Sequence, residues 1–207
     1  MGFFKDQVIE TKHLNGINSY VLPTNVKDVV TISGSILGGT LYSPSKNPQI
    51  STFTTAMLDK GTSNKDKYEI SDALDSVGAE LKFGCTRHHI YFTGHCLNSD
   101  VNMVIEILAD QLKTPAFGND EIDKLKTRMI GQLEQSLEDT KKQALISFLR
   151  ILYPKNHPNY RYKTEENLDF IKAINQRDLK TFHDSAYGIN TMNIAVAGDV
   201  NPKEFNE

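Results

Sequence analysis

The chain has 207 residues, enough for one substantial hydrophobic core, and its 39% hydrophobic and 24% charged residues are ordinary for a globular protein. Its 23 Lys and Arg against 26 Asp and Glu give a net charge of −3, which argues against nucleic acid as the main partner. Two cysteines imply no disulfide framework, and without a secretory signal or an apolar run of membrane-spanning length we expect a cytoplasmic protein that does not enter a membrane.

The first forty residues predict three strands. Segments 7–14, 17–23 and 28–39 are rich in Val, Ile and Thr, and turn residues separate them. In the third segment the run VVTISGSIL alternates apolar with small polar residues, which is typical of a strand with one buried face.

The middle of the chain predicts helices around a further pair of strands. Apolar spacing indicates a helix over about 48–58 and another over 67–78, where Gly78 suits the C-terminal cap. Residues 79–97 predict two strands, or one long bent strand with a kink near Gly84 to His88. A helix is then expected over 100–115.

The rest of the chain predicts a long helical region, a surface loop, two short helices and a last strand. These segments lie at 120–152, 153–167, 167–174, 177–187 and 191–200. The order of strands and helices predicts an α+β fold, with a mostly antiparallel sheet and helices packed on one face. We find no domain break and no internal repeat, and therefore expect a single domain over residues 1–207.

An ordered series of short motifs runs from Val8 to Phe205, nearly the whole chain. The series resembles the N-terminal domain of the pitrilysin/insulinase metallopeptidase family, to which mitochondrial processing peptidase also belongs. The resemblance implies a half-clamshell domain that forms one half of a larger two-domain or two-subunit unit. The motifs that carry it are ML-x-KGT, VGAEL, F-x-x-x-E, LYPKNHPNYRY, I-x-x-I-x-x-x-D-L-x-x-F and YGINTMNIAVAGDVNP.

The resemblance also locates the zinc site of the active family members, which are metalloendopeptidases. In the inverted motif H-x-x-E-H, two His one helical turn apart hold the metal with a distant Glu, and the Glu inside the motif is the general base. The corresponding residues here are Thr52, Thr55 and Ala56, with Gln132 in place of the distant Glu. Glu134 takes that place if the alignment of the long helix shifts by two residues.

These side chains do not supply the chemistry of the family. A Thr hydroxyl is a poor zinc ligand, Ala56 has no donor atom, and the amide of Gln132 is uncharged. The Thr55 hydroxyl is too weak a base to take a proton from water near neutral pH. We therefore predict that the catalytic positions are vacant, that no metal or cofactor is bound there, and that the chain alone does not hydrolyse peptides.

The same helix also has a purely structural interpretation. We expect Phe53, Met57 and Leu58 to pack into a core. For Thr52 and Thr55 we expect hydroxyls bonded back to the helix backbone, and the alternative is contact with a ligand.

A cluster of sulfur and imidazole side chains raises the possibility of a relocated metal site. The cluster comprises Cys85, His88, His89, His95 and Cys96. Alternation along a strand directs His88 and His89 to opposite faces, and likewise His95 and Cys96. We expect ordinary strand residues, although a hairpin can bring such side chains together.

The resemblance further implies a substrate-binding strand. In the family, the strand after the turn at VGAEL binds peptide as an added β-strand through backbone hydrogen bonds. Here that strand carries Lys82, Phe83, Gly84 and Cys85 along the groove. Phe83 either fills a pocket or points into the core.

Our leading hypothesis is a non-catalytic homologue of the zinc metallopeptidases. It contributes a peptide-binding groove or partners an active zinc-bearing subunit, so the expected partners are an extended peptide and a homologous domain, which is a zinc-bearing subunit or a second copy in a homodimer. One alternative is a purely structural subunit of a larger complex. The other is a metalloenzyme that uses the relocated Cys/His site.

Overall fold

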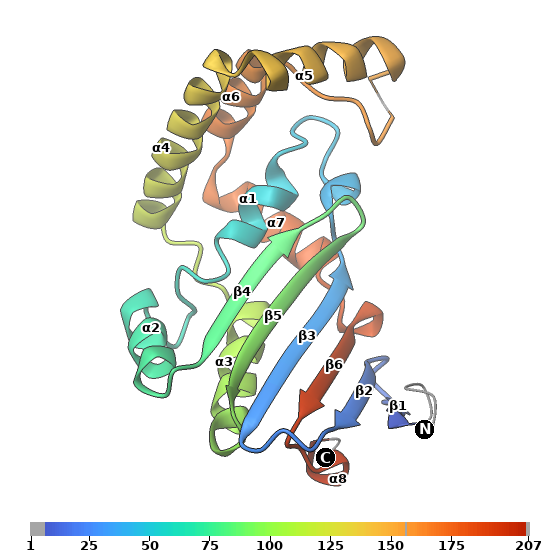
Figure 1. The fold of residues 1–207 in the computed structure, drawn as a ribbon. Coiled ribbons are helices and arrows are strands. Elements are labelled where there is room, and N and C mark those ends of the chain that lie inside the picture. Colours follow the sequence, from blue (N-terminus) through green and yellow to red (C-terminus); the bar gives the residue numbers. More distant parts are fainter. Residues whose placement is uncertain (1–6, 156, 206–207) are drawn as a thin grey trace.

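The computed structural model describes residues 7–155 and 157–205 of the chain. Its centre is a six-stranded sheet with the order β1-β2-β6-β3-β5-β4 (Figure 1). Every neighbouring pair in this order is antiparallel except β2 with β6, which confirms the predicted mostly antiparallel α+β fold. The strands are β1 (Ile9–Lys12), β2 (Asn18–Pro23), β3 (Val29–Leu37), β4 (Glu80–Cys85), β5 (His89–Leu97) and β6 (Asn193–Gly198).

Only one face of the sheet is covered by helices. Along β5 exposed and buried residues alternate without exception, so Phe92 and Cys96 lie in the core while Tyr91 and His95 lie on the open face. Figure 1 shows α3 behind the sheet and the front of the strands free. The predicted arrangement of helices on one face is therefore confirmed.

The helices surround the sheet at its covered face and at one end. The predicted helical region 120–152 is divided in two, because Asp139 adopts an extended conformation (φ −84°, ψ 92°) and its carboxylate accepts a 3.0 Å hydrogen bond from the Lys142 N–H, which caps the next helix. The helices are α1 (Ile50–Ala56), α2 (Lys67–Ser76), α3 (Val101–Lys113), α4 (Asn119–Gln135), α5 (Thr140–Leu152), α6 (Thr164–Ala173), α7 (Gln176–Ala186) and α8 (Pro202–Phe205).

Two hydrophobic clusters stabilise the fold. In the first, the covered face of the sheet packs on α2 and α3, with Phe92 and Val104 fully buried. In the second, α1 packs with α4, α6 and α7 around Phe53 and Leu179, which are also fully buried. Among the described residues, no helix is both long and apolar enough to cross a bilayer.

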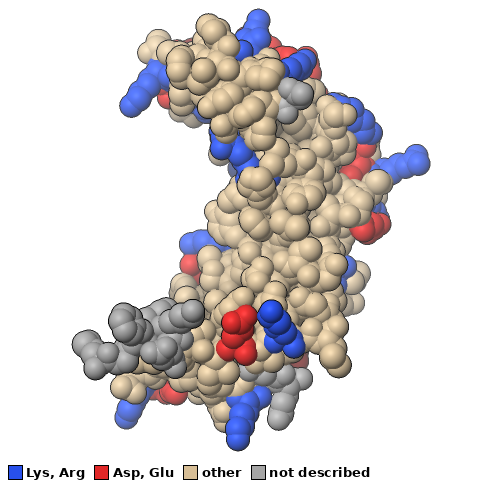
Figure 2. Space-filling view, turned by 90° about the vertical axis from the view of Figure 1, so that its right-hand side faces the viewer, with Lys and Arg blue, Asp and Glu red and all other residues tan. Residues whose placement is uncertain are grey.

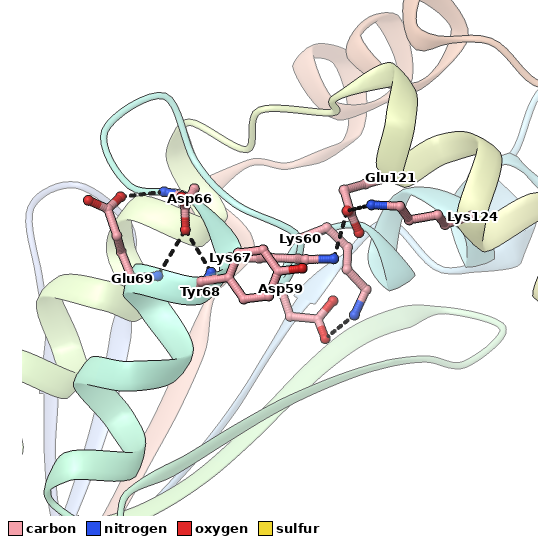
Figure 3. Close-up of polar contacts among 8 residues, drawn as sticks. All are labelled: Asp59, Lys60, Asp66, Lys67, Tyr68, Glu69, Glu121 and Lys124. Carbon is pink, nitrogen blue, oxygen red and sulfur yellow. Dashed lines mark hydrogen bonds and ion pairs between the residues drawn. The ribbon is translucent and has the colours of Figure 1, made fainter.

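Ion pairs join the beginning of α2, in the first cluster, to the beginning of α4, in the second. The Glu121 carboxylate accepts hydrogen bonds from Lys67, at 2.7 Å, and from Lys124, at 2.8 Å (Figure 3). These bonds hold the pKa of the Glu121 carboxyl below its ordinary value, and the bond from Lys124 has the larger effect. At the start of α2, Asp66 and Glu69 form a reciprocal capping box that fixes the direction of the helix.

The molecule is curved. In the side view of Figure 2 its upper part, formed by α4, α5 and α6, and its lower part, formed by the sheet, bend toward the same side and enclose a hollow. The open face of the sheet and the inner sides of α1 and α5 therefore belong to a concave half of the molecule.

Matched glycine substitutions test the packing of the sheet. A Cβ at Gly34 would overlap the ring of Phe92 on the neighbouring strand and lie 2.7 Å from the Asn193 carbonyl, so we expect Gly34→Ala to lower the free energy of unfolding by about 1–3 kcal/mol. Gly131 lies in α4 with open space around it, so Gly131→Ala should raise that free energy by about 0.5–1 kcal/mol. Urea unfolding of both variants measures the two effects, and equal changes in the two would contradict the packing described.

Candidate functional site

The short helix α1 lies at the centre of the candidate site. It packs between α7 and β4, and five of its seven residues are buried. Phe53 and the following Met57 and Leu58 are completely buried, as expected from the sequence. The helix ends at Ala56, and the chain then turns at Gly61, whose φ of +106° favours glycine.

The hydroxyls of α1 are used within the protein. Thr55 is only 2% exposed, and its hydroxyl donates to the Ser51 carbonyl at 2.9 Å and lies 3.3 Å from the Tyr187 hydroxyl. The bond to Ser51 is the backbone bond predicted for Thr55. Burial raises the pKa of Tyr187 far above its usual range, so the contact between Thr55 and Tyr187 is one between two neutral groups.

A second set of polar contacts ties α1 to the sheet. The Ser51 hydroxyl donates to the Gly38 carbonyl at 2.6 Å and lies 3.1 Å from the Cys85 sulfur at the end of β4. Ser51 and Thr55 are one helical turn apart, so the two contacts fix both the position and the rotation of α1 beside the edge of the sheet.

The residues at the positions of the family's zinc ligands do not fit a zinc ion. Of the residues expected at the ligand positions, Thr52 offers only a neutral hydroxyl, Ala56 offers no donor, and Gln132 on α4 is an exposed neutral amide. At the expected base position, the Thr55 hydroxyl is committed to Ser51 and Tyr187. Within the described part of the chain, no three His, Cys, Asp or Glu side chains are grouped so that they could hold a metal. We therefore derive no metal-dependent step for this site.

A hollow of about 410 Å³ lies beside these positions. Its walls come from the end of α1, from β4 and β5, and from α4. Lys60 pairs with Asp59 at 2.8 Å and Lys82 pairs with Glu80, whereas Arg128 of α4 makes no ion pair with the described residues. The hollow is lined by Thr55, Ala56, Asp59, Lys60, Leu81, Lys82, Phe83, Tyr91, Thr93 and Arg128.

Strand β4 forms the edge of the sheet next to this hollow. Its hairpin closes with a 2.8 Å bond from the Thr86 N–H to the His89 carbonyl, and its residues pair in register from Cys85 with Ile90 back to Glu80 with His95. Hydrogen-bonded and non-hydrogen-bonded residue pairs alternate in an antiparallel ladder, and Thr86 with His89 is a hydrogen-bonded pair. The backbone N–H and C=O groups of Leu81, Phe83 and Cys85 therefore point away from β5. These groups are the ones that an added strand would pair with.

The four residues expected along the groove are placed differently from one another. Lys82 and Phe83 line the hollow, and Phe83 also packs against the core, so both interpretations of this side chain apply. Gly84 lies beneath the ring of Tyr91, which a Cβ at Gly84 would overlap. The Cys85 sulfur is turned toward Ser51.

The cysteines and histidines of the hairpin are dispersed rather than grouped. Cys96 is 4% exposed in the core, where burial raises the pKa of its thiol. His95 is on the open face, 3.7 Å from Glu80, and His88 lies in the turn before β5 with its ring 6.2 Å from that of His89. This geometry does not favour the relocated metal site.

Sequence reasoning missed two residues of the site. Tyr187 comes after α7 and reaches α1 from 132 positions along the chain, and nothing local in the sequence indicates that contact. Arg128 lies four residues before Gln132 in α4, so helical periodicity alone places it on the same face.

The comparisons with known proteins agree with this geometry. A family model for insulinase, peptidase family M16, matches residues 20–158. The chain belongs to the insulinase family.

Three similar proteins show that this chain resembles both a protease and proteins of other kinds. An uncharacterized zinc protease of Mycobacterium leprae is 26% identical over 153 residues, which are 74% of this chain and 34% of the protease. Subunit 1 of the mouse mitochondrial cytochrome b-c1 complex is 22% identical over 84% of this chain and 36% of that subunit. The crystal structure of a peptidase M16 inactive domain from Pseudomonas fluorescens superimposes with a TM-score of 0.86 at 20% identity, covering 96% of this chain and 48% of that one.

The chain thus spans about a third of the length of the curated relatives it matches, and about half of that inactive domain. At this level of identity the structural match shows the fold alone.

Two adjacent threonines test how α1 is held. Thr55→Val removes the bonds to Ser51 and Tyr187 and should lower the free energy of unfolding by about 1–3 kcal/mol. Thr54 is fully buried and its hydroxyl has no partner among the described residues, so Thr54→Val should leave stability unchanged or raise it by about 1 kcal/mol.

Chemical denaturation measures the free energy of unfolding of the two variants. The two values can be compared directly, because both variants replace Thr by Val in the same helix. A larger loss from Thr54→Val than from Thr55→Val would contradict the hydrogen bonding described for α1.

Proposed function

We propose that the chain is a non-catalytic insulinase-family half that presents the edge of β4 to an extended peptide. The observation that carries this proposal is that an open strand edge lies next to a helix, α1, whose side chains are all neutral. The edge backbone of β4 faces outward beside the hollow, while the residues predicted at the family's ligand and base positions, Thr52, Thr55, Ala56 and Gln132, are all neutral. Backbone pairing needs no metal, so peptide capture can persist where hydrolysis does not.

A second insulinase-family domain completes the chamber in this proposal. The molecule is concave in side view (Figure 2). Tyr91, Thr93 and Leu97 are exposed on the open face of the sheet and form a surface that a facing domain would enclose. The partner domain carries zinc or is a further copy of this chain, and it belongs to the same polypeptide or to another.

A purely structural role is the second candidate, and the similarity to subunit 1 of the cytochrome b-c1 complex favours it. In that case the groove at β4 would bind no peptide, even in the assembled complex. Peptide titration of the chain alone and of the assembled complex separates the two roles.

Metal analysis tests the vacant positions. Protein purified without a His tag should contain far less than one zinc per chain, because the donors at these positions are neutral. The variant carrying Thr52→His, Ala56→His and Gln132→Glu should take up about one zinc per chain, since it restores three ligands at family spacing. A double variant that keeps Ala56 is the control, because two ligands do not make a tight zinc site.

Zinc in stoichiometric amount in the unaltered protein would contradict the loss of the site. Failure of the triple variant to bind zinc while it remains folded would show that these positions are not those of the family's ligands.

Proline substitution tests backbone pairing at β4. The Phe83 N–H faces outward, so Phe83→Pro removes a bond to an added strand without removing one to β5. Phe83→Ala is the matched control, because it removes only the side chain. We expect isothermal titration with extended, neutral peptides to show weak binding that Phe83→Pro reduces about three- to tenfold more than Phe83→Ala does.

If circular dichroism shows that Phe83→Pro lowers the folded fraction, Leu81→Pro and Leu81→Ala repeat the test, because the backbone N–H of Leu81 also faces outward. Equal affinities of the Pro and Ala variants at both positions would contradict pairing through the edge of β4.

A further inference from the structure

A larger hollow lies toward the beginning of α1. Its volume is about 930 Å³, within the range of ligand-binding sites. The first half of α1, the end of α4 and the inner face of α5 form three of its walls, and residues from 40–48, 155 and 157–167 form the others. Thr52 lies in its lining, so this hollow begins at the helix whose other end lines the hollow beside β4.

The charged side chains that line this hollow are all cations. They are Lys142, Lys155 and Arg161, and no Asp or Glu occurs among the described residues of the lining, although acidic residues outnumber basic ones in the whole chain by 26 to 23. Lys155 has a long ion pair of 3.7 Å with Glu166. Among the described residues, Lys142 and Arg161 have no ion-pair partner, so two cations are free to bind an anion from outside.

The same hollow has an aliphatic wall. Leu133 of α4 and Leu145, Ile146 and Leu149 of α5 line it, and α5 contains no buried residue at all. Leu145 is 55% exposed and Phe148, in the next turn, is 58% exposed. Leu145 belongs both to the lining and to this exposed apolar surface of α5.

The opposite wall is held by local contacts. The ring of His157 stacks on Tyr153 with the centroids 4.3 Å apart, and its Nδ1 accepts a 3.0 Å bond from the Asn159 N–H. Tyr162 packs edge-on against Phe170 at 5.1 Å. A wall fixed in this way loses little freedom when a ligand binds.

We propose that this hollow binds a segment of a partner protein that carries both carboxylates and apolar side chains. Lys142 and Arg161 pair with the carboxylates, and the aliphatic side of α5 receives the apolar side chains. A nucleic acid would also satisfy the cations, and Tyr160 and Tyr162 line the hollow, but the α5 wall is aliphatic and offers bases no ring to stack on, whereas it suits apolar side chains. The proposal is independent of strand pairing at β4.

The test uses a fluorescently labelled peptide of alternating Glu and Leu, and a second peptide with Gln in place of every Glu. We expect anisotropy to show that the Glu peptide binds the whole chain at least about tenfold more tightly than the Gln peptide. That advantage should shrink in high salt, because exposed charges are screened. Equal affinity of the two peptides would overturn the proposal.

Two adjacent lysines on α5 provide a matched control. Lys142→Gln and Arg161→Gln should each weaken binding of the Glu peptide about three- to tenfold. Lys141→Gln removes the same charge one position earlier, outside the lining, and should change affinity little. The helix cap is kept in all three variants, because Asp139 bonds the backbone N–H of Lys142 and not its side chain.

Phe83→Pro should leave the ratio of the Glu-peptide affinity to the Gln-peptide affinity unchanged, because backbone pairing at β4 does not distinguish the two peptides, and this separates the hollow from the groove at β4. Equal losses from Lys141→Gln and Lys142→Gln would overturn the proposal, and so would tighter binding of a single-stranded oligonucleotide than of the Glu peptide.

Discussion

The burial of α1 is the constraint on which the rest of the structure depends. Thr55 is almost inaccessible to water and is surrounded by neutral groups, including a Tyr187 phenol that burial keeps protonated. A carboxylate at this position without a metal would be an uncompensated buried charge, which costs several kcal/mol. In the proposed non-catalytic role, loss of the metal and loss of the charged side chains therefore favour each other. The Thr55 hydroxyl, which bonds to the Ser51 carbonyl, suits this buried position without either.

A helix as short as α1 has little stability of its own, so tertiary packing decides where it lies. Phe53 anchors it in the cluster shared with α4, α6 and α7, while Ser51 fixes it to the end of β4. The bonds of Glu121 to Lys67 and Lys124 join the beginnings of α2 and α4, and so couple the two hydrophobic clusters. The groove at β4 is thus positioned by contacts from both halves of the molecule, and not by its own strand alone.

The parts of the fold that depend on local pattern were predictable from the sequence. Alternation in β3 and β5 follows from a sheet with one buried face, and Gly78 has the positive φ of +63° expected after a helix. Asp139 was not predicted as a break, because the apolar spacing continues on both sides of it and only the capping bond to Lys142 ends the run. The parallel pairing of β2 with β6 and the contact of Thr55 with Tyr187 join distant segments, so no local pattern encodes them.

The distribution of charge connects the two hollows. Thr52 lines one and Thr55 and Ala56 line the other, so a neutral α1 lies between Arg128 at one end and Lys142 and Arg161 at the other, and none of these three cations has an ion-pair partner among the described residues. Concave surfaces with low-dielectric walls concentrate the field of such cations, even in a chain whose net charge is −3. In the function proposed above, this charge on α4, on α5 and in the loop before α6 attracts an anionic segment into the concave half, while the neutral side chains of α1 provide no base that could activate water for attack on it.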